Sequence, residues 1–270
     1  MVTEGVFRDR DIISITDISP DEILYLCEVA ESLYHDDRKG RRYSWLNKLS
    51  RRKMGYAFYE PSTRTKGSNV TGSDELGWSF DGFTGIEGTS VMKKESIRDT
   101  VKMFEANHCD VLVMRHPKDG SLQWAADVAS VPVINGGDGK NEHPTQALLD
   151  MFTLYMFNNR GFDGLNIGFG GDLSHGRTIR SLSLALSNFR DITIRWAAED
   201  FFGIPGDLEA ILKSRNVRVE RMDSVRDVLA ASDFYYMTRP QLERITKEDL
   251  ETPGVVALMK KYGVDLSGGN

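Results

Sequence analysis

The sequence alternates short apolar runs with longer helical patterns, and a polar or glycine-rich turn follows most of the runs. The runs are MGYAFYE, HCDVLVMRHP, VPVING and LNIGFGG, followed by ITIRWAAE, VRVERM and FYYMTR. Strands that alternate with helices form parallel sheets, which helices cover on both faces. Ligands of such sheets bind outside the carboxyl ends of the strands. We therefore expect the chemistry of this chain to lie in the turns that follow its strands.

Length and pattern together predict two domains. The chain has 270 residues, and domains of ordinary size number about two at this length. A capping-box spacing at Ser19 predicts a helix through His35, and the stretch after Thr65 reads as helical until Gly77. A long helical pattern from His143 to about Asn158 falls near the middle. The predicted fold class is α/β with two parallel-sheet domains, a first over residues 1–142 and a second over residues 143–270.

Composition excludes several classes of protein. A net charge of −6 and a pI near 5.5 disfavour nucleic-acid binding, which needs clustered excess Lys and Arg. No apolar run approaches the length of a membrane span, and the N-terminal segment lacks the apolar core of a signal peptide. We expect a cytoplasmic protein without membrane contact. Cys27 and Cys109, far apart and without metal or redox spacing, are expected to be buried, reduced thiols.

FYEPSTRTKGS places Ser62, Thr63, Arg64 and Thr65 directly after the first predicted strand. If Ser62 begins a helix, the free N–H groups of the first turn and the positive end of the helix dipole favour an anion there. The hydroxyls and Arg64 would complete a phosphate cradle. A capped helix with a surface arginine is the alternative interpretation.

Two further strand ends carry polar residues. Arg115 closes the strand DVLVM, and His143 with Gln146 opens the long middle helix. Each residue alone fits an ordinary role, a surface arginine or a helix cap. Together they converge on the region of the proposed phosphate cradle, which favours a common site.

GFGGDLSHGRT has the first two glycines of a dinucleotide fingerprint, but Leu173 occupies the place of the third. We therefore reject NAD binding. Arg177, at the start of the next helix, and Arg239, at the end of the strand FYYMT, could each bind a carboxylate. Neither a metal-ligand pair nor a serine-nucleophile motif is found, so no cofactor is expected.

FYEPSTRTKGS, VMRHP, GDGKNEHPTQALLD, GDLSHGRT and YMTRPQLER occur in this order at a characteristic spacing. With them the chain resembles the aspartate/ornithine carbamoyltransferase family across residues 1 to about 250. The last two motifs resemble the aspartate-binding branch. The resemblance implies transfer of the carbamoyl group of carbamoyl phosphate to the α-amino group of L-aspartate in pyrimidine synthesis, without metal or cofactor.

The resemblance also implies roles for individual residues. Ser62 to Thr65 hold the phosphate with help from Arg115. Thr65, Arg115 and His143 polarise the carbamoyl oxygen, and Gln146 contacts the carbamoyl amide. Arg177, Arg239 and Gln241 hold the aspartate.

SVMKKESIRDT resembles the mobile loop of the family, whose Ser and Lys, here Ser90 and Lys93, enter the site of a neighbouring subunit in a trimer. A solvated Lys-Lys pair is the alternative. The family usually has Gly where this chain has Lys94, and Gly permits a positive φ that Lys adopts poorly. Glu60, Arg177 and Arg244 are expected to form the charge cluster that links the two domains of the family.

Family members continue beyond this length with a His-Pro-Leu-Pro segment and a long helix, and this sequence contains no His-Pro-Leu-Pro. We expect a second domain that lacks its C-terminal part. Two hypotheses follow: an active carbamoyltransferase, or a catalytically impaired paralogue that serves as a scaffold or regulatory subunit and still binds carbamoyl phosphate. Regulatory chains are possible partners that the sequence does not decide.

Overall fold

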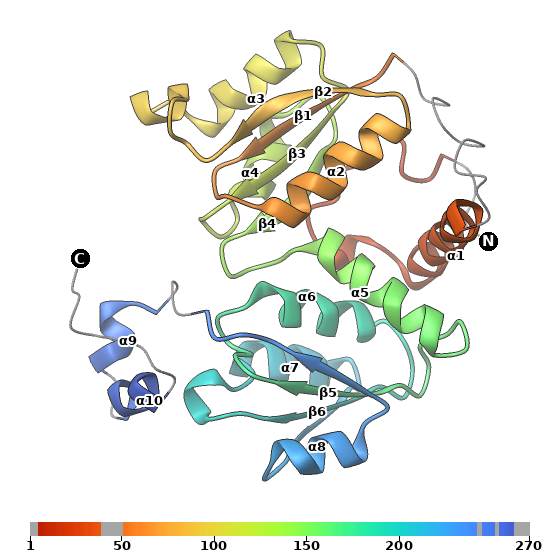
Figure 1. Cartoon of the computed structure of the whole chain (residues 1–270), viewed down its shortest axis with the longest axis vertical. Helices are drawn as coiled ribbons and strands as arrows, with labels where there is room; N and C mark the ends of the chain where they lie inside the picture. The colour runs from red at the N-terminus through yellow and green to blue at the C-terminus, as the bar shows by residue number, and fades with distance from the viewer. Residues whose placement is uncertain (1–4, 39–50, 242–244, 252–253, 262–270) are drawn as a thin grey trace. The chain divides into compact units, whose positions relative to one another are not determined.

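A computed structural model describes residues 5–38, 51–241, 245–251 and 254–261 and divides the chain into two compact units (Figure 1). The first unit comprises Met1–Gly164 with Arg177–Ile192, and the second comprises Leu165–Gly176 with Thr193–Asn270. Each unit contains one four-stranded parallel sheet. The predicted α/β fold with two parallel sheets is confirmed, whereas a domain boundary at residue 142 stays a prediction.

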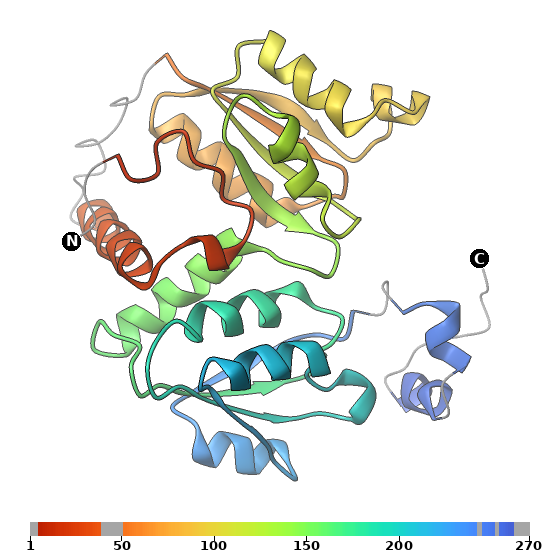
Figure 2. The same cartoon turned by 180° about the vertical axis from the view of Figure 1, so that it is seen from behind.

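The first sheet has the strand order β2-β1-β3-β4. Its strands are β1 (Lys53–Phe58), β2 (Ser79–Thr84), β3 (Val111–His116) and β4 (Val133–Asp138). Helix α2 (Thr63–Glu75) covers one face, and α3 (Ile97–Ala106) and α4 (Ser121–Val128) cover the other (Figures 1 and 2). Phe58 and Phe104 are almost fully buried on these opposite faces. Each contributes ~1.5–3 kcal/mol of burial free energy.

The first unit also holds α5 (Pro144–Phe157) and the helices that pack against it. The latter are η1 (Ile15–Asp17), α1 (Pro20–Arg38) and α6 (Arg177–Leu186), and the short η3 (Ser90–Lys93) follows β2. Helix α5 begins with a proline at its first position, where a missing N–H costs nothing, and His143 is its N-cap. The predicted long helix from His143 to about Asn158 is thus confirmed.

The second sheet has the strand order β7-β6-β5-β8. Its strands are β5 (Asn166–Gly170), β6 (Thr193–Ala197), β7 (Arg218–Arg221) and β8 (Phe234–Met237). Helices α7 (Gly206–Ser214) and α8 (Val225–Ala231) lie on opposite faces (Figures 1 and 2). The remaining elements of the second unit are η4 (Asp200–Phe202), α9 (Lys247–Glu251) and α10 (Val255–Lys261).

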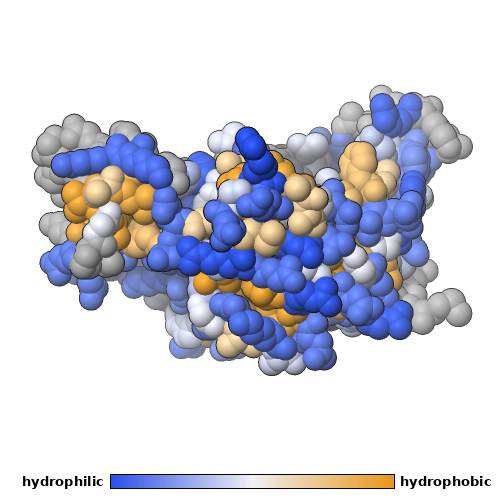
Figure 3. Space-filling model, turned by 90° about the horizontal axis from the view of Figure 1, so that it is seen from below, coloured by the Kyte–Doolittle hydropathy of each residue, from blue (hydrophilic) through white to orange (hydrophobic). Residues whose placement is uncertain are grey.

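The surface of the protein carries hydrophobic groups in separate patches among hydrophilic ones, as the view from below shows (Figure 3). On α8, Val225 and Leu229 are exposed one helical turn apart. Among the described helices, none is long and apolar enough to cross a membrane. Cys27 and Cys109 are buried free thiols, as predicted.

Candidate functional site

Strand order places one candidate site on each sheet. In a parallel sheet, ligands bind where the strand order reverses, at the carboxyl ends of the two strands that flank the reversal. In the first sheet this point lies between β1 and β3, and in the second between β5 and β8. The turns that follow these four strands contain most of the residues that the sequence singled out.

The turn after β1 leads into the first turn of α2. Ser62 is the N-cap of α2, with extended backbone angles, and its side chain makes no capping hydrogen bond. Thr63 and Arg64 are exposed at the start of the helix. The N-terminal N–H groups of a helix and its dipole favour an anion at this position. The prediction that Ser62 begins a helix is confirmed, and the phosphate cradle stays a prediction.

His143 is held at the start of α5 with one ring nitrogen fixed as an acceptor. Its Nδ1 accepts a hydrogen bond from the backbone N–H of Gln146 at 3.3 Å. A backbone N–H can only donate, so Nδ1 has no proton and the neutral ring carries its proton on Nε2. Nε2 lies 3.3 Å from Oγ1 of Thr65, on the first turn of α2. The imidazole therefore presents an N–H group beside the first turn of α2.

Burial and two nearby guanidinium groups keep this imidazole neutral. His143 is 5% exposed. Its burial, followed by the charges of Arg177 and Arg115, lowers its pKa from 6.5 to about 3. At neutral pH His143 is thus a hydrogen-bond donor and not a cation.

Glu60 pairs with both Arg115 and Arg177. Its Oε2 is 3.2 Å from Nε of Arg115 and 3.5 Å from Nη2 of Arg177. Nη1 of Arg177 donates to the carbonyl oxygen of Gly139 at 2.8 Å. Gly137 permits this packing, because a Cβ there would lie 2.7 Å from Cζ of Arg177. The expected partnership of Glu60 with Arg177 is present within the first unit, and Arg244 lies outside the described residues.

Gln146 lies in the first turn of α5, and its side-chain N–H group donates to Asp150 Oδ1 at 3.0 Å. Ser90 and Lys93 are exposed on η3. Lys94 ends η3 in the left-handed region, at φ 68° and ψ 28°. This backbone conformation is one that glycine adopts readily and lysine adopts at a cost in strain.

In the second unit, a buried carboxylate holds the turn that follows β8. Oδ2 of Asp172, in the turn after β5, accepts the backbone N–H of Gln241 at 2.9 Å. Arg239 is exposed in the same segment. Sequence reasoning missed Asp172, although its place directly after a strand at the switch point was a usable signal.

A hollow of about 650 Å³ lies at the carboxyl ends of the second sheet. It is lined by residues that follow each of the four strands, among them Gly171, Ala198, Met222 and Thr238. Its size falls in the range of small-molecule sites. Arg239 and Gln241 belong to the segment that borders this hollow.

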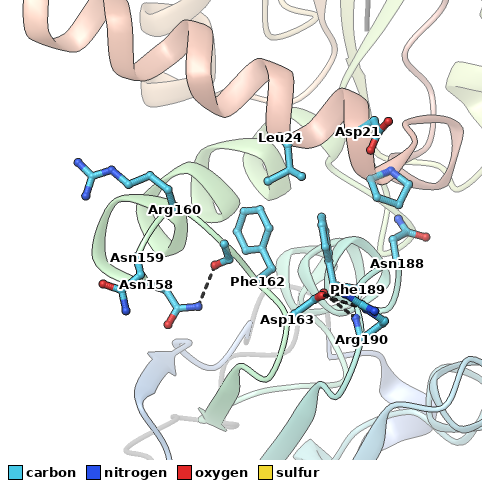
Figure 4. Close-up of a pocket in the computed structure, with 12 residues that line it drawn as sticks. Asp21, Leu24, Asn158, Asn159, Arg160, Phe162, Asp163, Asn188, Phe189 and Arg190 are labelled. Carbon is cyan, nitrogen blue, oxygen red and sulfur yellow. Dashed lines mark hydrogen bonds and ion pairs between the residues drawn. The ribbon is translucent and has the colours of Figure 1, made fainter. Parts of the chain in front are cut away.

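A separate hollow of about 700 Å³ lies in the first unit, at the start of α1 (Figure 4). Leu24, Phe162 and Phe189 line it, and none of the residues predicted from the sequence as substrate contacts does. Arg190, which also lines the hollow, forms an ion pair with Asp163 at 2.8 Å. This hollow is not a part of the candidate site.

The structure therefore groups the predicted residues unequally. Thr65, Arg115, His143 and Arg177 lie close together in the first unit, and Glu60 pairs with the two arginines. Ser62, Thr63 and Arg64 begin the helix that carries Thr65. Arg239 and Gln241 lie in the second unit, and Ser90 and Lys93 lie on an exposed turn.

Comparison with known proteins adds independent findings. Residues 10–156 match the family model for the carbamoyl-P binding domain of aspartate/ornithine carbamoyltransferase. The aspartate carbamoyltransferase catalytic subunit of Thermococcus kodakarensis is 39% identical over 244 residues, which cover 90% of this chain and 76% of that protein. The corresponding subunit of Methanococcus vannielii is 38% identical over 257 residues, 94% of this chain and 82% of that protein.

Solved structures give the same result. The catalytic subunit of M. jannaschii aspartate transcarbamoylase is similar with a TM-score of 0.78 and 35% identity, over 90% of this chain and 78% of that one. Aspartate transcarbamoylase from Trypanosoma cruzi, in complex with carbamoyl phosphate and aspartate, has a TM-score of 0.85 and 31% identity. That match covers 97% of this chain and 80% of the other.

Proposed function

Because the chain belongs to the aspartate/ornithine carbamoyltransferase family, we propose that it is an aspartate carbamoyltransferase. It transfers the carbamoyl group of carbamoyl phosphate to the α-amino group of L-aspartate and releases N-carbamoyl-L-aspartate and phosphate. The observation that carries the proposal is the neutral His143 beside Thr65, Arg115 and Arg177 at the switch point of the first sheet.

The reaction builds negative charge on the carbamoyl oxygen when the amine attacks the carbamoyl carbon. Nε2–H of His143, the hydroxyl of Thr65 and the guanidinium of Arg115 are the donors that we assign to this oxygen. Donors fixed before the reaction stabilise the developing charge without reorganisation, and loss of one typically costs ~3 kcal/mol. A neutral imidazole suits this role because it donates a hydrogen bond without protonating the amine.

The phosphate group is assigned to the start of α2, where Ser62, Thr63 and Arg64 surround the helix N-terminus. The departing phosphate accepts the proton of the amine, so no protein base is needed. The carbonyl oxygen of Gln146 is the group that we assign to the carbamoyl NH₂, because its own NH₂ donates to Asp150.

The two carboxylates of aspartate are assigned to Arg177, Arg239 and Gln241. A guanidinium fork binds a carboxylate through two parallel hydrogen bonds, a geometry that lysine cannot reproduce. Holding the amine next to the carbamoyl carbon supplies much of the remaining acceleration.

A steady-state assay with carbamoyl phosphate and L-aspartate tests the proposal. We expect equal amounts of carbamoyl-aspartate and phosphate, and no carbamoylated product when L-ornithine replaces aspartate. Binding of carbamoyl phosphate without turnover would instead favour the scaffold hypothesis.

The proposal includes a trimer in which Ser90 and Lys93 reach the site of a neighbouring copy. Three exposed hydrophobic residues support an interface near η3: Phe80, Ile86 and Met92 are 40%, 41% and 63% exposed. They lie on or after β2, which is an edge strand of the first sheet. Exposed apolar side chains that gather at one edge mark interaction surfaces.

Mixing of two impaired variants tests this shared site. Lys93→Ala and His143→Ala should each keep little activity, because each removes one part of every site. In mixed trimers, some sites combine an intact His143 with an intact Lys93 of the neighbour. Random mixing predicts about one quarter of the wild-type activity. No recovery in trimers shown to have exchanged chains would exclude a shared site.

A cytoplasmic location also belongs to the proposal. The free thiols Cys27 and Cys109 agree with a reducing compartment. Fractionation of the source cells, with detection of this chain in the soluble fraction, would test it.

A further inference from the structure

Asp172 accepts hydrogen bonds from two sides of the second unit. Its Oδ1 accepts from the backbone N–H of Ser174 at 3.2 Å and of His175 at 3.0 Å. Oδ1 also accepts from Nδ1 of His175 at 3.0 Å. Oδ2 accepts from the backbone N–H of Gln241 at 2.9 Å. The carboxylate thus links the turn after β5 to the turn after β8.

The pairing fixes both the charge of the carboxylate and the tautomer of the ring. Asp172 is fully buried, which alone would raise its pKa, but the hydrogen bonds from His175 and Gln241 outweigh burial and lower it. An ionised carboxylate can only accept, so Nδ1 of His175 carries a proton. Ser174 Oγ lies 2.8 Å from this Nδ1 and donates to the carbonyl oxygen of Phe201 at 2.9 Å.

The ring of His175 is held in place by aromatic neighbours. It is 6% exposed, and its centroid lies 4.9 Å from that of Phe201 and 6.0 Å from that of Phe202. Rotation of the ring is therefore restricted, and Nδ1 stays directed at Asp172. The buried ring gives the carboxylate one defined position.

The same two turns are joined by a second contact. Thr238 Oγ1 donates to the carbonyl oxygen of Asp172 at 2.8 Å. Gly171 has φ +92°, and a Cβ there would lie 2.0 Å from the carbonyl oxygen of Thr238. The turn after β8 therefore packs against the turn after β5, through Thr238 of the first and Gly171 and Asp172 of the second.

We propose that His175 is a positioning residue for aspartate binding. By orienting the carboxylate of Asp172, it holds the backbone of Gln241 and with it the segment that carries Arg239. The inference rests on the proposed function, which assigns Arg239 and Gln241 to the aspartate. His175 itself does not contact the substrate in this assignment.

Two variants separate the hydrogen bond from the packing of the ring. His175→Phe keeps an aromatic ring against Phe201 and Phe202 but removes the donor. His175→Asn places an amide NH₂ near the position of Nδ1 and removes the ring. As a matched control, Asn166→Ala removes another donor to a carboxylate, that of Asp233 at 3.0 Å, at the opposite end of β5.

For His175→Phe we expect the KM for aspartate to rise about tenfold or more, as for a lost charge-assisted hydrogen bond. The KM for carbamoyl phosphate should stay within about twofold, because the contacts assigned to it lie in the other unit. The KM for aspartate of His175→Asn should lie closer to that of wild type than to that of His175→Phe. Asn166→Ala should leave both KM values unchanged. Equal KM values for aspartate in His175→Phe and wild type would overturn the proposal.

Amide hydrogen exchange provides a test that does not need activity. In His175→Phe the N–H of Gln241 should exchange faster, whereas amides in the middle of β5 should keep their protection. Unchanged exchange at Gln241 would overturn the positioning role. If wild type forms no carbamoyl-aspartate, the proposed function fails, and the exchange measurement still decides whether His175 holds this segment.

Discussion

The two units of this protein place polar side chains at equivalent points of their sheets but hold them in different ways. In the first unit, His143 and Arg177 are each 5% exposed and are fixed by hydrogen bonds to backbone groups. In the second unit, Arg239 is exposed, and its segment depends on the buried carboxylate of Asp172. The switch point of the first sheet thus carries buried side chains that are fixed in place. The switch point of the second sheet carries an exposed segment that Asp172 holds by a hydrogen bond.

This difference matches the demands of the proposed reaction. Stabilisation of a developing charge requires donors that are fixed before the substrate arrives. Recognition of a second substrate allows an exposed arginine to be ordered on binding, at a cost in side-chain entropy. We therefore expect changes at the donors assigned to the carbamoyl oxygen, Thr65, Arg115 and His143, to act mainly on kcat. Changes in the second unit should act mainly on the KM for aspartate.

Replacement of His143 should give the largest effect. His143→Ala removes the Nε2–H donor, and we expect kcat to fall about 10²–10³-fold with little change in the KM for carbamoyl phosphate. His143→Gln, whose amide can place an N–H near Nε2, should lose less. His35→Ala, an exposed histidine on α1, serves as control. Equal losses in the Ala and Gln variants would argue against a donor role.

Replacement of Arg239 tests the role in aspartate binding that is assigned to the second unit. Arg239→Ala should raise the KM for aspartate on the order of 100-fold, because a charge-assisted contact to a carboxylate is lost. Arg239→Lys should recover only part, since lysine lacks the planar fork. Arg218→Ala, on the exposed β7, is the matched control. A parallel rise in the KM of both substrates would contradict the division of labour between the units.

The turns after β1, β4 and β5 could be predicted from the sequence, because a Gly- or hydroxyl-rich stretch follows an apolar run in each case. The edge strand β2 was not predicted. Its sequence SFDGFT is largely exposed and contains Asp81 and Gly82, so it lacks the apolar signal of a central strand. Its neighbour β1 and the parallel register decide its structure, and these are long-range contacts.

The protonation and contacts of side chains could not be predicted from the sequence either. His143 was predicted as a site residue, but its neutral state follows from burial and from two arginines distant in the chain. The place of Asp172 after a strand marks it as a candidate, but the contacts that its carboxylate accepts from His175 and Gln241 are known only from the structure. The positive φ of Lys94 could be anticipated only through the glycine of the family.

The stability of the protein should depend on pH through His143. Its folded pKa of about 3 lies below its ordinary value of 6.5, so the unfolded chain binds the proton more tightly. The neutral ring therefore contributes stability that is fully present above pH 6.5 and is lost as the pH falls toward 3. Between pH 7 and pH 5 the loss is about 2 kcal/mol.

Urea unfolding of wild type and His143→Gln at these two pH values measures this effect. The variant should lose less stability on acidification, by about 2 kcal/mol, since it has no group to titrate. Parallel losses in both proteins would show that His143 is not held neutral. In that case the lowered pKa of His143 could no longer be used to contrast the buried side chains of the first unit with the exposed segment of the second.

The smallest effect is expected at Lys94, where a lysine of the first unit adopts a positive φ that Gly171 adopts in the second. The second unit uses Gly171 at a positive φ, in a place where a Cβ would collide with Thr238. Lys94 adopts a positive φ on an exposed turn, where its side chain costs only conformational strain. Lys94→Gly should therefore stabilise the protein by up to about 1 kcal/mol in urea unfolding. Lys102→Gly, within α3, should instead destabilise it by about 1 kcal/mol, and equal losses in both variants would show that the turn stores no strain.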